Sequence, residues 1–288
     1  MELIFSIVVP ALNSCDTLEL LVRCLEAQDI PRERFECLVV DDGSTDGTPE
    51  FLQNYQPGVN LRYFVHHANK GRSQARNTAC EQANGDFLLF LDADMLPEPD
   101  CLSFYEQALT QDPNLDVLSG GRYHIHLGTN AEGRLGVLSQ MLGVPPEALF
   151  TSQVAEQFQR LRATAQLGGH PGHAMAKLEA QWPDICQKYP KSVLCAYSLI
   201  TASVAVRRSL FKKIGGFDVS MRRIEDTDLG VRLWKIGACF GFARDARAYH
   251  MYHVNQADRN NILLDRLAFF YRHPYQMIVM FYLWLYLL

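Results

Sequence analysis

The sequence lacks the features that are typical of membrane-spanning, nucleic-acid-binding and zinc-stabilised proteins. It contains no stretch of about twenty apolar residues of the kind that crosses a bilayer as a helix. It carries no long basic run, and its net charge is −5, so nothing favours a nucleic-acid partner. Its eight cysteines are scattered without a CxxC pair, which argues against a structural zinc and for a reducing compartment.

Strand-like and helix-like segments alternate over residues 4–126. Five short runs rich in β-branched or aromatic residues are separated by segments with apolar residues at helical spacing; these runs lie at 4–10, 35–44, 61–67, 86–94 and 115–126. The first run lacks the basic leader and cleavage site of a signal peptide, so we interpret it as a strand. The alternation predicts an α/β fold with a mostly parallel central sheet and helices on both faces.

The pattern changes at residue 128 and returns near residue 195. Residues 128–194 are rich in Gln, Ala, Gly and Pro, and they contain helical stretches, so we interpret them as a mostly helical insertion over the ligand-binding crevice, on the acceptor side. Residues 195–255 again predict strands and helices. Residues 256–288 predict a C-terminal helical tail that ends in twelve apolar or aromatic residues.

Two pairs of carboxylates follow predicted strands. Asp41 and Asp42 end the run VVDD, and Asp92 and Asp94 end the run FLLFLDAD. Parallel strands bring their carboxyl ends to one edge of a sheet, so both pairs are expected in one crevice. Each pair alone is equally compatible with a solvated loop. Together, oxygen ligands at the spacing of Asp92 and Asp94 suit Mg²⁺ or Mn²⁺.

Three further motifs each have a structural and a functional interpretation. Arg72 and Arg76, in NKGRSQARN, are either surface cations or contacts to phosphate. Glu225 and Asp226 precede an apolar helical pattern, where Asp226 is either an N-cap or a catalytic carboxylate. His250, in YHMYH, is either a structural residue or a ligand.

These motifs in this order resemble those of family 2 glycosyltransferases, which adopt the GT-A fold. The matching segments are, in order, SIVVPALN, VVDDGSTDGT, NKGRSQARN, GDFLLFLDAD, SLFKKIGGFD, EDTDLGVRLWKIG and a histidine strand. They cover residues 3–126 and 196–253. The resemblance implies an enzyme that moves one sugar from a nucleotide-sugar donor, most simply UDP-linked, to an acceptor hydroxyl with inversion.

The resemblance also implies where the donor lies. Pro10 and Ala11 would border the nucleobase, Asp42 with Asp41 would hydrogen-bond it, and Arg76 would lie beside the base and phosphates. Residues 1–127 would then form the donor-binding half, and residues 195–255 the acceptor and catalytic half. The full set of implied nucleotide-sugar residues is Pro10, Ala11, Asp41, Asp42, Arg76, Asp92 and Asp94.

The implied chemistry places one acidic group on each side of the reacting carbon. Asp226 would act as the general base, with Glu225 near the acceptor, because the attacking hydroxyl must lose a proton. Asp94 would bind Mn²⁺ or Mg²⁺, which neutralises the leaving diphosphate. His250, or alternatively His253, would complete the metal site.

Some features depart from the family's processive members or favour other functions. The sequence has no Q-x-x-R-W motif after the ED pair, which favours addition of one sugar per visit. One alternative is a nucleotidyltransferase, but PALNSCDT is not the glycine-rich, basic phosphate loop that such an enzyme needs. The other is an inactive relative that binds nucleotide or glycan within a membrane-associated assembly.

The acceptor is expected to be a glycan, a lipid-linked molecule or another hydroxyl compound. Residues 277–288 are too short to span a bilayer. They are interpreted as a helix docked on the domain, a peripheral membrane contact, or the start of a longer segment, and Tyr and Trp suit an interface. The expected location is cytoplasmic, including the inner face of the membrane.

Overall fold

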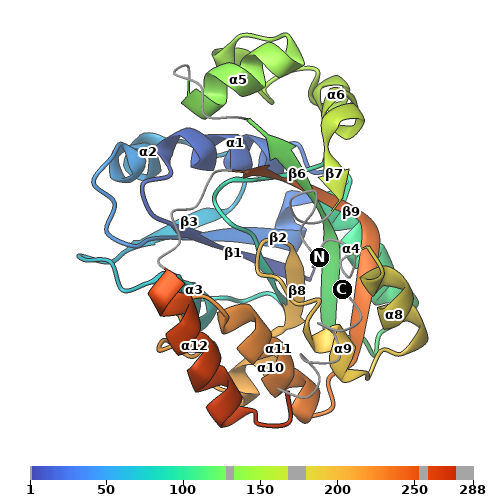
Figure 1. Ribbon diagram of the computed structural model, residues 1–288. Coiled ribbons are helices and arrows are strands. Elements are labelled where there is room, and N and C mark those ends of the chain that lie inside the picture. The colour runs from blue at the N-terminus through green and yellow to red at the C-terminus, as the bar shows by residue number, and fades with distance from the viewer. Residues whose placement is uncertain (1, 128–132, 168–179, 253–258, 277–288) are drawn as a thin grey trace.

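A single mixed sheet forms the centre of the protein. The computed structural model describes residues 2–127, 133–167, 180–252 and 259–276. Over these residues nine strands form one sheet in the order β3-β2-β1-β4-β8-β6-β9-β5, and β7 pairs with β6 (Figure 1). The strands are β1 (Phe5–Ala11), β2 (Phe35–Asp41), β3 (Leu61–Val65), β4 (Phe87–Phe90), β5 (Met95–Pro97), β6 (Val117–His126), β7 (Gln166–Leu167), β8 (Val204–Arg207) and β9 (Phe240–Tyr252).

Helices connect these strands and cover the sheet. In the part of the chain that is described, they are α1 (Cys15–Glu26), α2 (Thr48–Asn54), α3 (Arg72–Glu81), α4 (Cys101–Gln111), α5 (Gly133–Leu142), α6 (Val154–Thr164), α8 (Trp182–Lys188), α9 (Val193–Ala196), α10 (Arg208–Lys213), α11 (Glu225–Lys235) and α12 (Arg259–Arg272), with short 3₁₀ turns η1 (Arg32–Arg34) and η2 (Pro146–Ala148). No helix among the described residues has the length and apolarity that crossing a membrane requires.

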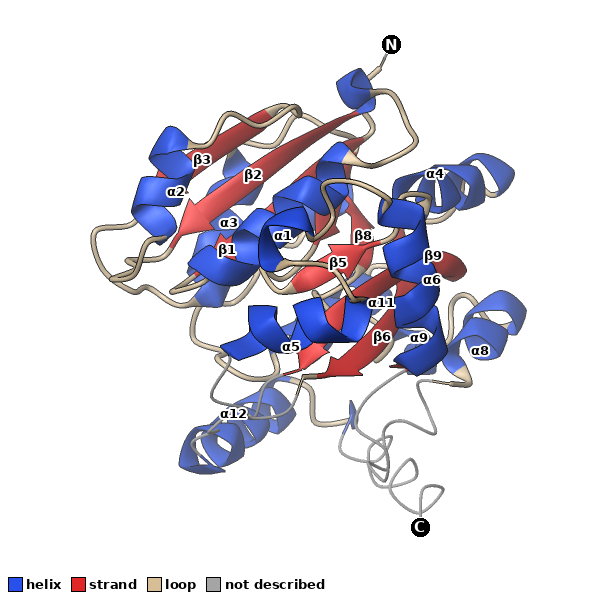
Figure 2. Cartoon of the chain, turned by 90° about the horizontal axis from the view of Figure 1, so that it is seen from above, coloured by secondary structure: helices blue, strands red, loops and turns tan. Residues whose placement is uncertain are grey.

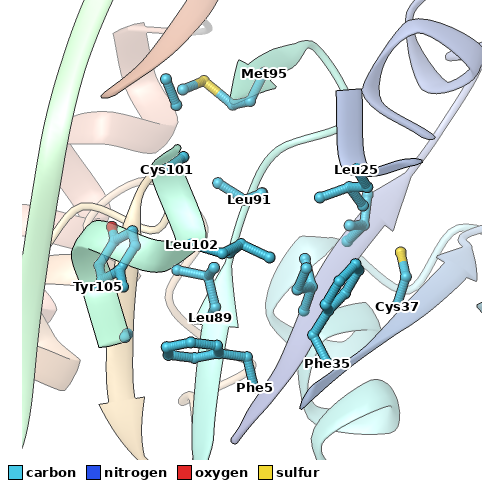
Figure 3. Close-up of a cluster of buried hydrophobic side chains, with 14 of the residues drawn as sticks. Phe5, Leu25, Phe35, Cys37, Leu89, Leu91, Met95, Cys101, Leu102 and Tyr105 are labelled. Atoms are coloured by element: carbon cyan, nitrogen blue, oxygen red, sulfur yellow. The ribbon is translucent and has the colours of Figure 1, made fainter. Parts of the chain in front are cut away.

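The central strands are buried on both faces, and alternate side chains enter two separate cores. Phe5, Ile7 and Val9 of β1 pack with residues of α1 and α4 (Figure 3), whereas Val8 packs with residues of α3, α10 and α11. This division follows from the two-residue period of a strand. Helices therefore cover both faces of the sheet, and the predicted α/β fold with a mostly parallel sheet is confirmed.

The connectivity of the sheet differs from the simple order that the sequence suggests. The fifth predicted run, which is β6, does not lie beside β4, because β8 is inserted between them and is antiparallel to both. Residues from either side of the insertion therefore share one sheet. The division into four segments at residues 127, 194 and 255 remains a prediction.

The strand predicted at 86–94 is two pieces joined by a turn. β4 ends at Phe90, and the carbonyl oxygen of Asp92 accepts a hydrogen bond from Met95 N at 3.1 Å. The chain then forms β5, which pairs antiparallel with β9. This break places Asp92 and Asp94 in a tight loop at the carboxyl end of β4, the edge where the sequence predicts ligand binding.

The first described part of the insertion, residues 133–167, consists mainly of α5 and α6 and packs at one end of the sheet, whereas α8 packs against β9 away from them. α5 and α6 lie together beyond the end of β6, close to α1 (Figures 1 and 2). Arg162 of α6 forms a two-pronged ion pair with the buried carboxylate of Glu98, which also accepts a hydrogen bond from Tyr249. The insertion is thereby fixed to β9, next to His250.

Candidate active site

Arg76 is the residue that joins the acidic motifs. It lies on α3 with only 1% of its surface exposed. Its Nη2 contacts Asp92 Oδ1 at 2.8 Å, and its Nη1 donates to Glu225 Oε1 at 3.2 Å. Arg76 therefore brings together the loop after β4 and the first turn of α11, which are distant in the sequence.

The charges around Arg76 compensate one another. Burial lowers the pKa of Arg76, but the carboxylates of Asp92, Asp226 and Glu225 outweigh this and raise it above its usual value. Glu225 is also buried, and Arg72 Nε lies 2.5 Å from the same Oε1 atom. Burial and the neighbouring Asp226 carboxylate raise the pKa of Glu225 to about 7, although both arginines act to lower it.

Asp226 lies in the first turn of α11, and Thr201 orients its carboxylate. Thr201 Oγ1 donates to Asp226 Oδ1 at 2.9 Å, and Thr201 N donates to Oδ2 at 3.2 Å. Ile224 is the N-cap residue of α11, and it makes no side-chain capping bond, so Asp226 is not a cap. A Cβ atom on Gly230 would lie 2.1 Å from Ala196 O, so only glycine lets α11 approach α9 this closely.

The loop after β2 uses its two aspartates differently. Asp42 is buried and accepts hydrogen bonds from Lys70 N at 3.0 Å and Gly71 N at 2.8 Å, and His66 Nδ1 lies 2.7 Å from it. It therefore holds the loop that leads into α3. Asp41 Oδ1 accepts from Ser44 N at 2.9 Å, while its buried Oδ2 has no hydrogen-bond partner within the described structure.

Pro10 and Ala11 lie at the end of β1, directly beside this loop. They are in register with Val40 and Asp41 of β2, and Ala11 O accepts a hydrogen bond from Asp42 N at 2.8 Å. The loop is close-packed here, because a Cβ atom on Gly43 (φ +82°) would lie 2.9 Å from the backbone of Ala68.

Asp94 and His250 lie side by side at the ends of β5 and β9. His250 is in register with Met95, and its Nε2 lies 3.3 Å from Asp94 Oδ2. His253, the alternative to His250, lies outside the described residues. Within the described ranges, no group of three or more His, Cys, Asp or Glu side chains is arranged to hold a metal ion.

Two residues at the site were not predicted from the sequence. His124 of β6 lies beside His250, and their Nδ1 atoms are 3.4 Å apart. Thr201, which orients Asp226, follows the short helix α9. The histidines in YHIH are the signal that could have indicated His124, but only the pairing of β6 with β9 shows which of them faces His250. Nothing in the sequence around Thr201 marks it.

Comparison with known proteins identifies the family. The sequence profile described as "Glycosyl transferase family 2" matches residues 6–163. The chain is a family 2 glycosyltransferase. It is 30% identical over 280 residues to the uncharacterized glycosyltransferase YfnE of Bacillus subtilis (strain 168), and the match covers 92% of this chain and 69% of YfnE. Family membership leaves no place for the nucleotidyltransferase alternative.

Solved structures show the same fold. Staphylococcus aureus TarS (residues 1–349) in complex with UDP-GlcNAc superposes with a TM-score of 0.60 at 22% identity, over 88% of this chain and 60% of that chain. The mannosyltransferase PcManGT of Pyrobaculum calidifontis, in complex with GDP-Man and Mn²⁺, gives a TM-score of 0.58 at 19% identity, over 96% of this chain and 65% of that chain. The GT-A fold that the resemblance implies is confirmed.

Proposed function

We propose that this glycosyltransferase moves one sugar from a UDP-linked donor to an acceptor hydroxyl with inversion, by metal-assisted direct displacement. The observation that carries the proposal is the contact of one buried cation, Arg76, with both Asp92 and Glu225. This contact sets the acidic loop after β4 against the first turn of α11, which carries Asp226. With the donor held beside the loop after β4, Asp226 would act on the reacting carbon from the other side, as inversion requires.

Asp41 is better placed than Asp42 to accept a hydrogen bond from the nucleobase. The contacts of the Asp42 side chain noted above all tie it to residues 66–71. Asp41 is in register with Ala11 at the end of β1, and its Oδ2 atom is buried without a hydrogen-bond partner in the described residues. A buried acceptor without a donor is costly, and an N–H group of the base would satisfy it. Arg72 and Arg76 supply cations for the diphosphate.

Asp94 and His250 fit a divalent metal. One carboxylate and one imidazole suit Mn²⁺, and two protein ligands leave the remaining positions to diphosphate oxygens and water. The metal, when bound, would neutralise the negative charge that develops on the leaving diphosphate. Asp226, held by Thr201, would take the proton of the acceptor hydroxyl as it attacks, while Glu225 would hold Arg72 and Arg76 in place.

The donor site is tested by calorimetric titration of UDP and of GDP with Mn²⁺, repeated with EDTA. We expect UDP to bind in the presence of Mn²⁺ and to lose at least about tenfold in affinity with EDTA, because a metal ion held by Asp94 would neutralise the charge of the diphosphate. Asp94→Asn should reproduce the EDTA result with Mn²⁺ present. Asp184→Asn, at a side chain that is 80% exposed on α8, is the control and should bind like the parent.

Each other outcome of this titration would contradict a different element of the proposal. Equal binding of UDP with and without EDTA would overturn the metal assignment. Tighter binding of GDP would overturn the UDP assignment. Absence of binding by both nucleotides, together with absence of turnover, would favour an inactive relative that binds glycan.

We further propose that the face of α12 and the turn after it contacts a membrane. Leu267, Tyr271 and Tyr275 are 58%, 89% and 82% exposed and follow one another at four-residue intervals. They lead into the apolar segment 277–288, which lies outside the described residues. Tyrosine and leucine on one surface suit the interface of a bilayer, and a lipid-linked acceptor at the inner face of a membrane would match this placement.

Flotation with lipid vesicles tests the membrane contact. We expect the protein to float with phosphatidylglycerol vesicles and the double variant Tyr271→Ser/Tyr275→Ser to float several-fold less, because two interfacial aromatic anchors are lost. Tyr189→Ser is the matched control, since Tyr189 is 55% exposed but lies after α8. Equal flotation of all three proteins would refute a contact through this face.

A further inference from the structure

Three polar side chains lie in a row across neighbouring strands at the metal-binding end of the sheet. His250 of β9 is in register with Met95 of β5 on one side and with His124 of β6 on the other. Its two ring nitrogens face different neighbours: Nε2 lies 3.3 Å from Asp94 Oδ2, and Nδ1 lies 3.4 Å from His124 Nδ1. The sheet register thus gives each nitrogen of His250 a distinct partner.

The distance between Asp94 and His250 is suited to two ligands of one metal ion. Bonds of about 2.1–2.2 Å at a right angle separate the two ligand atoms by roughly 3 Å, close to the 3.3 Å found here. The ligand atom of His250 is then Nε2. An imidazole ring that binds metal through a neutral nitrogen carries its hydrogen on the other nitrogen, so Nδ1 of His250 must be a donor.

The facing Nδ1 atoms of the two histidines can share only one hydrogen. Without a metal ion, either ring can donate to the other. With a metal ion on His250 Nε2, only one arrangement remains, in which His250 Nδ1–H donates and His124 Nδ1 accepts. His124 must then be the neutral tautomer with its hydrogen on Nε2.

We propose that His124 is a positioning residue for the metal site, and that it fixes the tautomer and ring orientation of His250 by accepting this hydrogen bond. The proposal rests on the metal site described under the proposed function. The His124 side chain is only 4% exposed, and its ring stands at 80° to the ring of His250 with centroids 5.2 Å apart. A buried, strand-borne acceptor of this kind keeps His250 Nε2 aimed at Asp94, and such outer partners typically change metal affinity by about 10–100-fold when removed.

Three substitutions at position 124 separate the acceptor from the bulk of the side chain. In His124→Asn the amide oxygen can occupy the place of Nδ1, because both atoms are bonded to Cγ. In His124→Gln the amide reaches further, toward the place of Nε2, and His124→Leu offers no acceptor. The Asn and Gln variants are both polar and buried at the same site, so a general loss of packing would affect them alike.

The measurement is the affinity for Mn²⁺ with saturating UDP, by calorimetry or by the electron paramagnetic resonance signal of free Mn²⁺. We expect His124→Asn to stay within about threefold of the parent and His124→Gln and His124→Leu to lose about 10–100-fold. Spectra of ¹⁵N-labelled histidine with Mg²⁺ and UDP should show hydrogen on His250 Nδ1 in the parent and in His124→Asn. Urea unfolding of all four proteins checks that they are folded.

The affinities for Mn²⁺ test the role of His124 separately from the existence of the metal site. Parent-like affinity in His124→Leu, or equal losses in the Asn and Gln variants, would overturn the role of His124 and leave the metal site in place. Absence of Mn²⁺ binding by the parent itself would overturn the metal site and this inference together.

Discussion

Asp226→Asn is expected to lower kcat by about 10²–10⁴-fold, the usual contribution of a general base, and to leave the affinity for UDP within about threefold. The amide keeps the size of the carboxylate and can still accept from Thr201 Oγ1, but it cannot take a proton from the acceptor. The donor contacts proposed for Arg76 and Asp94 remain. Turnover with a hydrolysis or acceptor assay, beside UDP calorimetry, gives both quantities.

Two companion variants make this result specific to Asp226. Thr201→Val removes the hydroxyl that binds Asp226 Oδ1 at 2.9 Å but keeps the carboxylate, so it should lower kcat by no more than about tenfold. Glu225→Gln keeps an oxygen toward Arg72 and Arg76 and should lower kcat less than Asp226→Asn. A parent-like kcat in Asp226→Asn, or a larger loss in Glu225→Gln, would refute the base assignment.

Arg76→Met is expected to reduce the free energy of unfolding by about 3–5 kcal/mol at pH 8, because it removes the buried cation that contacts the buried carboxylate of Glu225. Glu225 and Asp92 both contact Arg76 in the parent. Arg72→Met is the matched control: Arg72 contacts the same Glu225 oxygen, but its side chain is 41% exposed, so a loss of no more than about 1 kcal/mol is expected.

The reduction in the free energy of unfolding caused by Arg76→Met should be larger at higher pH. Burial and Asp226 raise the pKa of Glu225 to about 7 from an ordinary value of 4.5, and Arg76 opposes this rise. A carboxyl group whose pKa is raised in the folded state stabilises the fold at pH values below about 4.5. That contribution to the free energy of unfolding is lost as the pH rises through about 7. Without Arg76 the pKa of Glu225 rises further, so the variant continues to lose stability as the pH rises above 7.

Urea unfolding at pH 5.5 and pH 8 measures this dependence. The difference between the parent and Arg76→Met should be larger at pH 8. The double variant Arg76→Met/Glu225→Gln should recover part of the stability, since the buried charge is then absent. An equal difference at both pH values, with no recovery in the double variant, would show that Glu225 is not the group left uncompensated.

The donor-side half of the fold could be predicted from the sequence because its signals are local. The alternation of strands and helices over residues 4–126 is visible in the apolar pattern, and the acidic loops follow directly from where strands end. The place of β8 could not be predicted in the same way, because a strand of four residues (Val204–Arg207), three of them buried, carries no mark of its partners.

The roles of single side chains in the site were harder to predict than their presence. Asp41 and Asp42 are adjacent in the sequence. Only the three-dimensional path of residues 66–71 shows that the Asp42 carboxylate accepts hydrogen bonds from this segment, while Asp41 Oδ2 has no hydrogen-bond partner in the described residues. Glu225 is expected near the acceptor, and only the structure shows that its carboxylate contacts the two arginines of α3. His124 depended on a register between strands more than a hundred positions apart.

The insertion of β8 between β4 and β6 has a consequence for synthesis on the ribosome. β4 ends at Phe90, while β8 begins only at Val204, so at ordinary elongation rates the nascent chain waits on the order of ten seconds for this partner. During that time one side of β4 has no neighbouring strand, and an unpaired apolar edge invites wrong pairing with other chains. The emerging protein should therefore depend on a chaperone until residue 207 has left the exit tunnel.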